Sequence, residues 1–516
     1  MLTRFTVLKK PILLVFYTLS FLLVGYNQAR ATHAMGADLQ YECLGGNTYR
    51  FTLKIYRDCQ GSDLNPTQNI AFSSASCGIA RFILQAPRVS LTELSPLCPA
   101  QQPFSTCNGG ILPGVEEHIY QLTYTLPAQC ADWLISWQLC CRNYAITNSV
   151  ITPNTRIYIE SYLNNLDVTC NNSPYFTTPP VPYLCDGQPF QFNNGAIDPD
   201  GDSLAFELVD PLEYVNGNPL PIDYMPGFSN TYPMATAPAN NFNFDGSSGQ
   251  FSFTPSGLQQ GIVALLVKEY RNGVLIGTTM RDIQMVVINC GNQPPQIGPP
   301  ANVTGGILTG NTFSICAGNT LGFTISGFDP NIADLLTMTS TLGSAIPGAT
   351  FSINGNNPVS GSFSWPTTLA DVGNYFFTLT VKDDGCPNAG QQVVGFNVIV
   401  NQGLILPPQD VVVCPTTTNS IQLVATTPNS GGGAYNWDPP TGLSNPAIRN
   451  PVASINGAAS YIVTYTAPGL CPVIEPVNVI PEAILSLAVD TAQICAGASV
   501  QLSATLTPLG APVPVT

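Results

Sequence analysis

Downstream of residue 180 the chain repeats a short motif that begins with a cysteine. The motif reads "CDGQPFQF" at Cys185, "CAGNTLGF" at Cys316 and "CAGASVQL" at Cys495, and "CPTTTNSIQL" at Cys414 is a looser copy. After each cysteine, apolar residues alternate with polar ones, as in a half-buried β-strand. The copies lie roughly 80 to 130 residues apart, which suits immunoglobulin-like β-sandwiches, the first with an insertion.

Three shorter motifs support the same architecture. "GQFSFTP" at Gly249 and "GSFSWP" at Gly361 each join a turn glycine to a short strand that ends in proline. "DVGNYFFTLTVKD" contains a D-x-G-x-Y pattern ending at Tyr375, which predicts a tyrosine corner ahead of an alternating strand. Asn272-Gly273 separates two strand patterns and predicts a type I′ hairpin.

Residues 32–178 form a different module that is dense in cysteine. "YRFTLKIYRD" and "DWLISWQL" alternate apolar and polar residues, so each predicts a half-buried strand of an antiparallel sheet. The module holds nine of the sixteen cysteines: Cys43, Cys59, Cys77, Cys98, Cys107, Cys130, Cys140, Cys141 and Cys170.

The first 31 residues are typical of an export signal. Basic residues precede an apolar run from Ile12 to Val24, and Ala29-Arg30-Ala31 offers an A-x-A cleavage site. The run is shorter than the roughly 20 residues that span a bilayer, which favours cleavage near Ala31 over a retained anchor. We expect a secreted or cell-surface protein with no transmembrane segment in the mature chain.

Sixteen cysteines in an exported chain predict disulfide bonds. The chain has no C-x-x-C pair and only His33 and His118 could supply imidazole, so a zinc site is disfavoured. Neighbouring side chains on a strand point to opposite faces, which predicts different partners for Cys140 and Cys141.

The odd number of cysteines in the first module leaves one for a partner outside it or unpaired. We expect Cys170 to bond with Cys185 or Cys290. In the sandwiches we expect the pairs Cys316–Cys386 and Cys414–Cys471, each stabilising the fold by roughly 3 to 5 kcal/mol.

The composition favours short strands and turns and disfavours nucleic acid as a partner. Charged residues make up only 9% of the chain, beside 45 glycines and 46 prolines. The formal net charge of -15 opposes binding to phosphate backbones, which requires clustered Lys and Arg.

Three aspartates stand at alternate positions in "AIDPDGDSL". Asp198, Asp200 and Asp202 follow the D-x-D-G-D rhythm in which carboxylates converge on a hard cation. An EF-hand would require an acidic residue at the twelfth position, which is Val209. Two interpretations remain: a calcium site completed by residues elsewhere, or a solvated turn.

A looser copy of this pattern occurs in "FDPNIADLL". Asp329, Asn331 and Asp334 keep two carboxylates there in altered spacing, which makes this turn a second candidate calcium site.

No catalytic constellation stands out, and we expect no enzyme activity. We expect both histidines to lie on the surface, without a nucleophile to activate. Exposed aromatic side chains could hold glycans, and Trp365, Trp437, Tyr435 and Tyr144 are candidates; for the two tryptophans we favour a place in the core.

The predicted organisation is all-β: a disulfide-rich amino-terminal β domain followed by tandem Ig-like β-sandwiches. The last segment holds about two strands, so we expect this chain to be the front portion of a longer protein. The predicted boundaries are 1–31 for the signal peptide, 32–178 for the cysteine-rich domain, 179–294, 295–401 and 402–482 for the sandwiches, and 483–516 for the start of a further, truncated domain.

Two motifs in the first module carry a resemblance to a known family. "THAMGADLQYECLGGNTYRFTLKIYRDCQG" at Thr32–Gly61, together with "WQLCCRN" at Trp137–Asn143, resembles the amino-terminal module of exported Bacteroidetes proteins labelled gliding-motility-associated or PKD-domain proteins. The downstream units resemble the cadherin-like, PKD and immunoglobulin-like repeats of such chains. "DPDGDSL" is similar to the aspartate-rich turn of cadherin-like repeats, which binds calcium in some members.

The resemblance implies an adhesin-like protein exported by type IX secretion, although the carboxy-terminal sorting domain of that route is not visible here. We therefore expect a non-catalytic scaffold for adhesion or surface matrix, with an unidentified surface, protein or glycan ligand. The alternatives are a carbohydrate-binding protein of a secreted degradative system and a hydrolase whose catalytic domain lies beyond residue 516.

Overall fold

The computed structural model describes residues 34–180, 183–413, 420–426, 433–455, 457–467, 471–481, 484–489, 499, 501 and 504–509. Over these residues the protein is all-β, which confirms the predicted fold class. Its short helical turns are η1 (Gln102–Phe104), η2 (Thr106–Asn108), α2 (Leu342–Ala345) and η3 (Leu369–Asp371). The predicted signal peptide lies outside the described residues. None of the described helices is long and apolar enough to cross a membrane.

The chain divides into two compact units. The first consists of the residues up to 296 together with 328–339 and 380–395, and the second consists of 297–327, 340–379 and 396–516.

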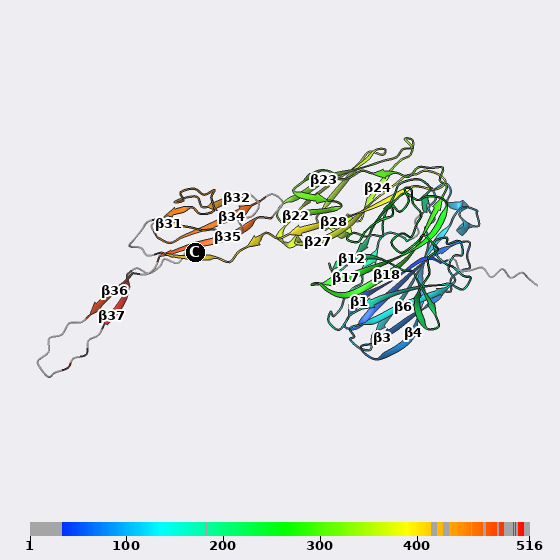
Figure 1. Cartoon of the computed structure of the whole chain (residues 1–516), viewed down its shortest axis with the longest axis horizontal. Helices are drawn as coiled ribbons and strands as arrows, with labels where there is room; N and C mark the ends of the chain where they lie inside the picture. The colour runs from blue at the N-terminus through cyan, green and yellow to red at the C-terminus, as the bar shows by residue number, and fades with distance from the viewer. Residues whose placement is uncertain are drawn as a thin grey trace, which may run out of the picture. The chain divides into compact units, whose positions relative to one another are not determined.

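A thirteen-stranded sheet dominates the first unit (Figure 1). Its order is β12-β17-β18-β1-β2-β5-β4-β3-β6-β7-β13-β14, with β9 beside β18. The strands are β1 (Ala34–Gly45), β2 (Thr48–Asp58), β3 (Thr67–Ser74), β4 (Ile79–Glu93), β5 (Val115–Thr125), β6 (Trp133–Cys140), β7 (Arg156–Leu163), β9 (Tyr183–Cys185), β12 (Ser203–Val209), β13 (Leu212–Val215), β14 (Asn218–Pro221), β17 (Gln259–Arg271) and β18 (Val274–Ile288).

The alternation in the sequence correctly identifies the buried face of this sheet. On β2, Tyr49, Phe51, Leu53 and Ile55 are fully buried, as the period of two predicts. On β6 the two tryptophans and Ile135 are buried in the same core. Burial of such large apolar side chains is the main favourable term that holds the sheet in place.

Strand β18 connects the first module to the segment that follows it. It pairs antiparallel with β17 over nearly its whole length, and it also pairs with β1 and with β7. Strands on both sides of the predicted boundary at residues 178 and 179 therefore share one sheet. The boundary itself stays a prediction. A repeated sequence motif indicates where a strand begins, but it does not indicate which sheet the strand joins.

Arg281 of β18 binds β1 through a buried ion pair. Its Nε and Nη2 atoms donate to Oδ2 of Asp38 at 3.2 and 3.0 Å, and both side chains are fully buried. Its Nη1 atom donates to the carbonyl of Thr178 at 2.7 Å and to Oδ1 of Asn194 at 2.9 Å. The guanidinium carbon also lies 4.1 Å from the ring centre of Phe176. A buried charge is tolerated when it is paired and hydrogen-bonded in this way.

The next residue, Asp282, binds the loop after β6. Nη1 and Nη2 of Arg142 donate to its two carboxylate oxygens at 2.9 and 2.6 Å, and both side chains are 1% exposed. Arg142 also donates to the carbonyl oxygens of Arg156 and Leu212. Because neighbouring side chains on a strand point to opposite faces, the two charges of β18 hold different partners.

The β17–β18 hairpin turns as the sequence predicts. Asn272 and Gly273 have φ values of 53° and 78°, and Arg271 pairs with Val274 across the turn. Positive φ at both central residues is the requirement of a type I′ turn, so that prediction is confirmed.

Two small sheets and a second core complete the first unit. One sheet contains β10 (Phe190–Asn193), β16 (Gln250–Phe253) and β15 (Asn243–Asp245); the other contains β11 (Ala196–Ile197) and β8 (Tyr175–Phe176). Phe192, Phe251 and Val263 belong to the core that these strands share with β17 and β18.

The segment from β19 to β28 contains two five-stranded sheets. Their orders are β19-β23-β26-β25 with β20 beside β23, and β21-β22-β28-β27-β24. The strands are β19 (Gln296–Ile297), β20 (Ala301–Thr304), β21 (Gly306–Thr309), β22 (Thr312–Cys316), β23 (Thr320–Phe328), β24 (Thr337–Ser340), β25 (Thr350–Asn354), β26 (Val359–Pro366), β27 (Gly373–Lys382) and β28 (Gln391–Asn401).

Buried rings join the two sheets into a sandwich. Phe313 of one sheet stacks on Phe323 of the other at 4.5 Å, and Phe323 stacks on Phe363 at 4.6 Å. The hydroxyl of Tyr375 donates to the carbonyl of Asp371 at 3.1 Å, so the predicted tyrosine corner is confirmed.

The next module follows the same plan. One sheet has the order β29-β35-β34-β32 with β30 beside β35, and β31 pairs with β33. A separate two-stranded sheet joins β36 to β37. The bounds are β29 (Leu404–Ile405), β30 (Gln409–Val413), β31 (Ser420–Gln422), β32 (Ala434–Asp438), β33 (Val452–Ser454), β34 (Ala459–Thr466), β35 (Val473–Pro481), β36 (Ile484–Val489) and β37 (Ala504–Leu509).

Fourteen cysteines of the described residues form seven disulfides, which supports the predicted oxidising compartment. The bonds are Cys43–Cys170, Cys59–Cys107, Cys77–Cys130, Cys98–Cys386, Cys140–Cys141, Cys185–Cys290 and Cys316–Cys471. Cys414 and Cys495 lie outside the described residues.

The predicted pairings were wrong. Cys140 and Cys141 bond to each other, because β6 ends at Cys140 and the alternation of a strand does not extend to Cys141. Cys170 bonds within the first module, and Cys98 is the cysteine of that module with a partner outside it.

The pairs Cys316–Cys386 and Cys414–Cys471 were also wrong, since Cys316 bonds to Cys471 and Cys386 to Cys98. Spacing along the chain could not reveal pairings that depend on which loops meet in space.

We expect Arg281→Met to lower the free energy of unfolding by about 3 to 5 kcal/mol, because it leaves the Asp38 carboxylate buried without its partner. Arg50→Met is the matched control. Arg50 pairs with Glu42 at 2.7 Å, but these side chains are 40% and 55% exposed, so its loss costs at most about 1 kcal/mol. Denaturant unfolding measures both changes, and equal losses in the two variants would contradict the role of the buried pair.

Candidate metal site

The aspartate turn between β11 and β12 is organised by Asp198. Its Oδ1 atom accepts the backbone N–H groups of Asp200 and Asp202, each at 2.9 Å. Gly201 has a φ of 80°, a left-handed conformation that glycine adopts without strain. Each of the three carboxylates offers one oxygen within 4.8 Å of the others, so the turn brings the three predicted residues together.

Arg271 of β17 supplies positive charge to this turn. Its Nε and Nη2 atoms donate to the two oxygens of Asp202 at 2.8 and 2.5 Å, and Nη2 also lies 3.3 Å from Oδ2 of Asp200. The register of β12 on β17 explains the approach, because Ser203 lies opposite Tyr270. A bidentate contact between a guanidinium and a carboxylate is among the stronger polar interactions in proteins.

Two asparagines extend the network to the segment that follows Cys170. The backbone N–H and Nδ2 of Asn172 donate to the two oxygens of Asp200 at 2.9 and 2.7 Å. Asn171 accepts from Arg271 at 2.9 Å and donates to Oε1 of Glu269 at 2.7 Å. The Cys43–Cys170 disulfide fixes the start of this segment.

Glu269 is a fourth carboxyl group beside the turn, and it is fully buried. Burial, reinforced by the charge of Asp198, raises the pKa of Glu269 to about 9. Burial likewise raises the pKa of Asp198 to about 6. Oδ2 of Asp198 and Oε2 of Glu269 are both buried and have no hydrogen-bond partner. Two of these four carboxyl groups, Asp200 and Asp202, contact the Arg271 guanidinium, and one oxygen each of Asp198 and Glu269 remains available to a proton or a cation.

The geometry fits a cation in part. The two buried oxygens without partners are suitable ligands for a hard cation. Both oxygens of Asp202, in contrast, are held by Arg271. Calcium would have to share these carboxylates with the guanidinium, so binding at Asp198, Asp200 and Asp202 stays a prediction.

Sequence reasoning missed Glu269, Arg271 and the two asparagines. The spacing of Glu269 and Arg271, two residues apart in "KEYRNG", indicates that both side chains lie on one face of a strand. The sequence does not indicate that β12 pairs with β17, and this pairing brings that face to the turn.

A second acidic cluster forms around "FDPNIADLL". Asp329 and Asp334 lie with Asp383 within ligand distance of one another, whereas Asn331 accepts the backbone N–H of Gln293. Burial raises the pKa of Asp383 to about 6, although Gly385 and Gly390 donate to its Oδ1. The sequence had not assigned Asp383 to this group, and a cation here stays a prediction.

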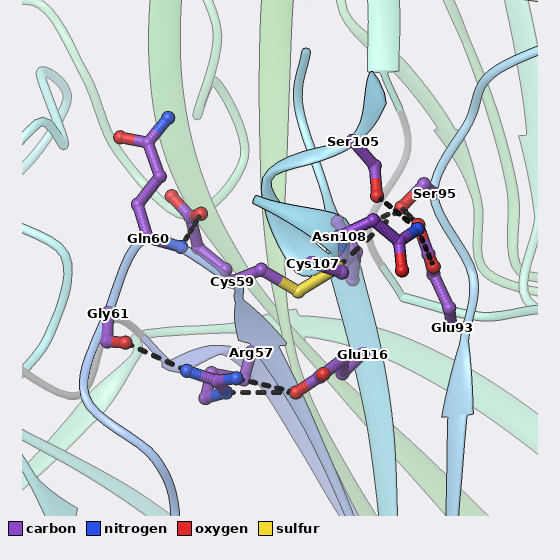
Figure 2. The surroundings of a disulfide bond; sticks show 12 residues. Arg57, Cys59, Gln60, Gly61, Glu93, Ser95, Ser105, Cys107, Asn108 and Glu116 are labelled. Atoms are coloured by element: carbon purple, nitrogen blue, oxygen red, sulfur yellow. Dashed lines mark hydrogen bonds and ion pairs between the residues drawn. A yellow bond between two sulfur atoms is a disulfide. The ribbon is translucent and has the colours of Figure 1, made fainter. Parts of the chain in front are cut away.

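Cys59, Cys107 and Glu116 also lie close together (Figure 2). The two sulfur atoms are bonded to each other, so neither is a thiolate that could bind a metal. Nε and Nη2 of Arg57 donate to Oε2 of Glu116 at 3.1 and 2.6 Å, and Nη1 donates to the carbonyl of Gly61. The disulfide and the ion pair therefore connect β2 to β5 and to the loop that contains η2.

The prediction that His118 lies on the surface was wrong, because it is 2% exposed. Its Nδ1 is 3.1 Å from Nη1 of Arg88 and its Nε2 is 3.1 Å from Oε2 of Glu116. Burial lowers the pKa of His118. Both ring nitrogens are engaged, so neither is free to act as a general base. His33 lies outside the described residues.

Three of the four aromatic side chains considered for glycan binding are buried. Trp365 and Trp437 are each 1% exposed, which confirms their place in the core, and Tyr435 is 9% exposed. Only Tyr144 of the four, at 66%, is open to solvent.

Comparisons with known proteins identify no family. No family model matches the chain, and no curated protein matches it. Among solved structures, the eight-domain immunoglobulin fragment of Down Syndrome Cell Adhesion Molecule shares 12% identity over 87% of this chain and 50% of that one, with a TM-score of 0.19. This chain thus spans about half the length of that structure.

Two further structures are similar at the same level. The human desmocollin-1 ectodomain has 11% identity over 73% of each chain and a TM-score of 0.18. An endo-fucoidan hydrolase of glycoside hydrolase family 107 has 16% identity over 60% of this chain and 44% of that one, with a TM-score of 0.17. Likeness this low supports no functional assignment.

We expect the free energy of unfolding to fall as the pH rises from about 4 to about 9. The folded-state pKa values of Asp198 and Glu269, about 6 and about 9, lie above the ordinary values for these carboxyl groups. The resulting stability is complete below the unfolded-state pKa values and is lost as the pH rises through the folded-state ones. Denaturant unfolding at several pH values, with a chelator present, measures the trend.

Glu269→Gln should flatten this dependence, because the amide keeps the shape and cannot ionise. Glu207→Gln is the matched control on β12, since Glu207 is 52% exposed and should leave the slope unchanged. If Glu269→Gln kept the wild-type slope of unfolding free energy against pH, Glu269 would not be the source of the pH dependence.

Proposed function

We propose that this chain is a non-catalytic, secreted or cell-surface scaffold that works in adhesion or in the surface matrix. The observation that carries the proposal is the set of seven disulfides in a multi-module β chain. Disulfides of this number persist outside the reducing cytoplasm. Modular β-sandwiches present loops on rigid supports, which suits surface recognition.

Two finer parts of the proposal rest on the resemblance of residues 32–61 and 137–143 alone. These are export by type IX secretion and association with gliding motility. The likeness of fold to adhesion ectodomains supports neither part.

The proposal predicts an oxidised protein outside the cell. Antibody should bind the protein on intact cells of its source or recover it from their medium. Mass spectrometry without reduction should recover Cys185–Cys290 and Cys316–Cys471 as linked peptides. Protein found only inside the cells, with these cysteines reduced, would reject the proposal.

We also propose that Asp198, Asp200 and Asp202 bind calcium. The support is the convergence of their carboxylates and the buried, unpartnered oxygen of Asp198. The neighbouring Glu269 supplies a second such oxygen. A bound divalent cation would offset the mutual repulsion of these carboxyl groups.

Calcium should raise the thermal midpoint of the wild-type chain relative to a chelator. A ligand that binds only the native state stabilises it by about 2.7 kcal/mol at one hundred times its dissociation constant. The effect should be larger at pH 8 than at pH 5, because protons compete for Asp198 and Glu269.

The Asp200→Ala variant should lose the calcium response, and Asp63→Ala, which removes a 93% exposed carboxylate, should keep it. An unchanged wild-type midpoint would show that the aspartates only shape a turn.

A carbohydrate-binding protein of a secreted degradative system is the second candidate. A cavity of about 550 Å³ in the first unit favours it, because polar side chains line it and one of them, Gln138, has a buried Oε1 without a partner. Arg156, Glu213 and Tyr214 also line this cavity. Binding of the wild-type chain to a glycan on an array would favour this candidate over a purely structural scaffold.

A further inference from the structure

We propose that three of the disulfides act in series as a covalent path that limits how far the chain extends under tension. The three are Cys43–Cys170, Cys185–Cys290 and Cys316–Cys471. They follow one another along the chain without overlapping, so each one closes a separate loop. Their sequence separations are 127, 105 and 155 residues.

Between these loops only short backbone segments connect one disulfide to the next. Residues 170–185 join the first disulfide to the second, and residues 290–316 join the second to the third. A pull on residues 34 and 481 is therefore transmitted through 34–43, 170–185, 290–316 and 471–481. This path contains about 60 residues and spans about 200 Å when fully extended, against about 450 residues and about 1,600 Å for the reduced chain.

The hydrophobic cores lie mainly within the closed loops. Most of the core built on Phe51, Trp133 and Trp137 falls between Cys43 and Cys170. Most of the core around Phe251 falls between Cys185 and Cys290, and most of the core around Trp437 falls between Cys316 and Cys471. When a module unfolds under force, the residues between its two bonded cysteines therefore do not add to the distance between the ends of the chain.

The remaining disulfides do not shorten this path. Cys59–Cys107 and Cys77–Cys130 lie inside the first loop, and Cys140–Cys141 joins neighbours. Cys98–Cys386 closes a loop of 288 residues that overlaps all three on-path loops. It provides a longer second route, which runs through Cys59–Cys107 to residue 98, across to residue 386 and back to residue 316. This route carries tension only when a bond of the first route is missing.

Such a path suits a chain that is anchored at one end and pulled at the other. Noncovalent sandwiches open cooperatively under load, whereas the disulfides hold the ends of each module together whether the module is folded or not. The inference concerns the purified chain and does not depend on adhesion or on calcium. Its failure is thus distinguishable from failure of the proposed function.

Single-molecule stretching tests the proposal. The chain from residue 32 to 516 is produced in an oxidising secretory compartment and held by handles at its two ends. The oxidised chain should reach a limiting length of about 100 residues, or about 350 Å. With reductant present the limit should rise about fivefold, to about 1,700 Å.

Paired variants separate bonds on the path from bonds off it. Cys185→Ser with Cys290→Ser should lengthen the oxidised limit by about 190 Å, because tension then takes the route through Cys59–Cys107 and Cys98–Cys386. Two controls, Cys59→Ser with Cys107→Ser and Cys98→Ser with Cys386→Ser, should leave the limit unchanged.

The limit depends on covalent connectivity, so it holds even for a variant that folds poorly, provided that peptide mapping finds the other disulfides formed. An oxidised wild-type limit well beyond 350 Å would overturn the proposal. A longer limit in either control pair would overturn it as well.

Discussion

Two opposite charges side by side on β18 organise the first unit. Arg281 binds Asp38 of β1, and Asp282 binds Arg142 of the loop after β6. All four side chains are buried, and a buried charge without its partner is strongly destabilising, so β18 must meet both partners at once. A slip of one residue would exchange the faces of the two charges and break both pairs. The position of the amino-terminal module on the following hairpin depends on this requirement.

Local patterns in the sequence were sufficient to predict the strands and turns. The alternation on β2, the Asn272-Gly273 turn and the tyrosine corner at Tyr375 all have short-range causes, and the structure confirms each one. The predicted disulfide partners were wrong, mostly because these pairings depend on contacts between distant loops. Cys98 and Cys386, for example, are separated by 288 residues, and no local signal connects them.

The aspartate turn shows the same division between local and distant information. Asp198, Asp200 and Asp202 converge because they belong to one turn, which the sequence made visible. Their surroundings come from a strand some 70 residues away, which places Arg271 and Glu269 beside them. That strand changes the chemistry of the turn: a guanidinium partly neutralises it, and a buried carboxyl group nearby retains its proton near neutral pH.

The loops closed by sulfur also change what a protease can achieve. Proteins outside the cell meet proteases, and exposed loop tips are their preferred targets. A single cut between Cys43 and Cys170, or between Cys185 and Cys290, leaves two pieces that remain bonded to each other. The same holds between Cys316 and Cys471. Most single cuts would therefore nick this protein without shedding any part of it.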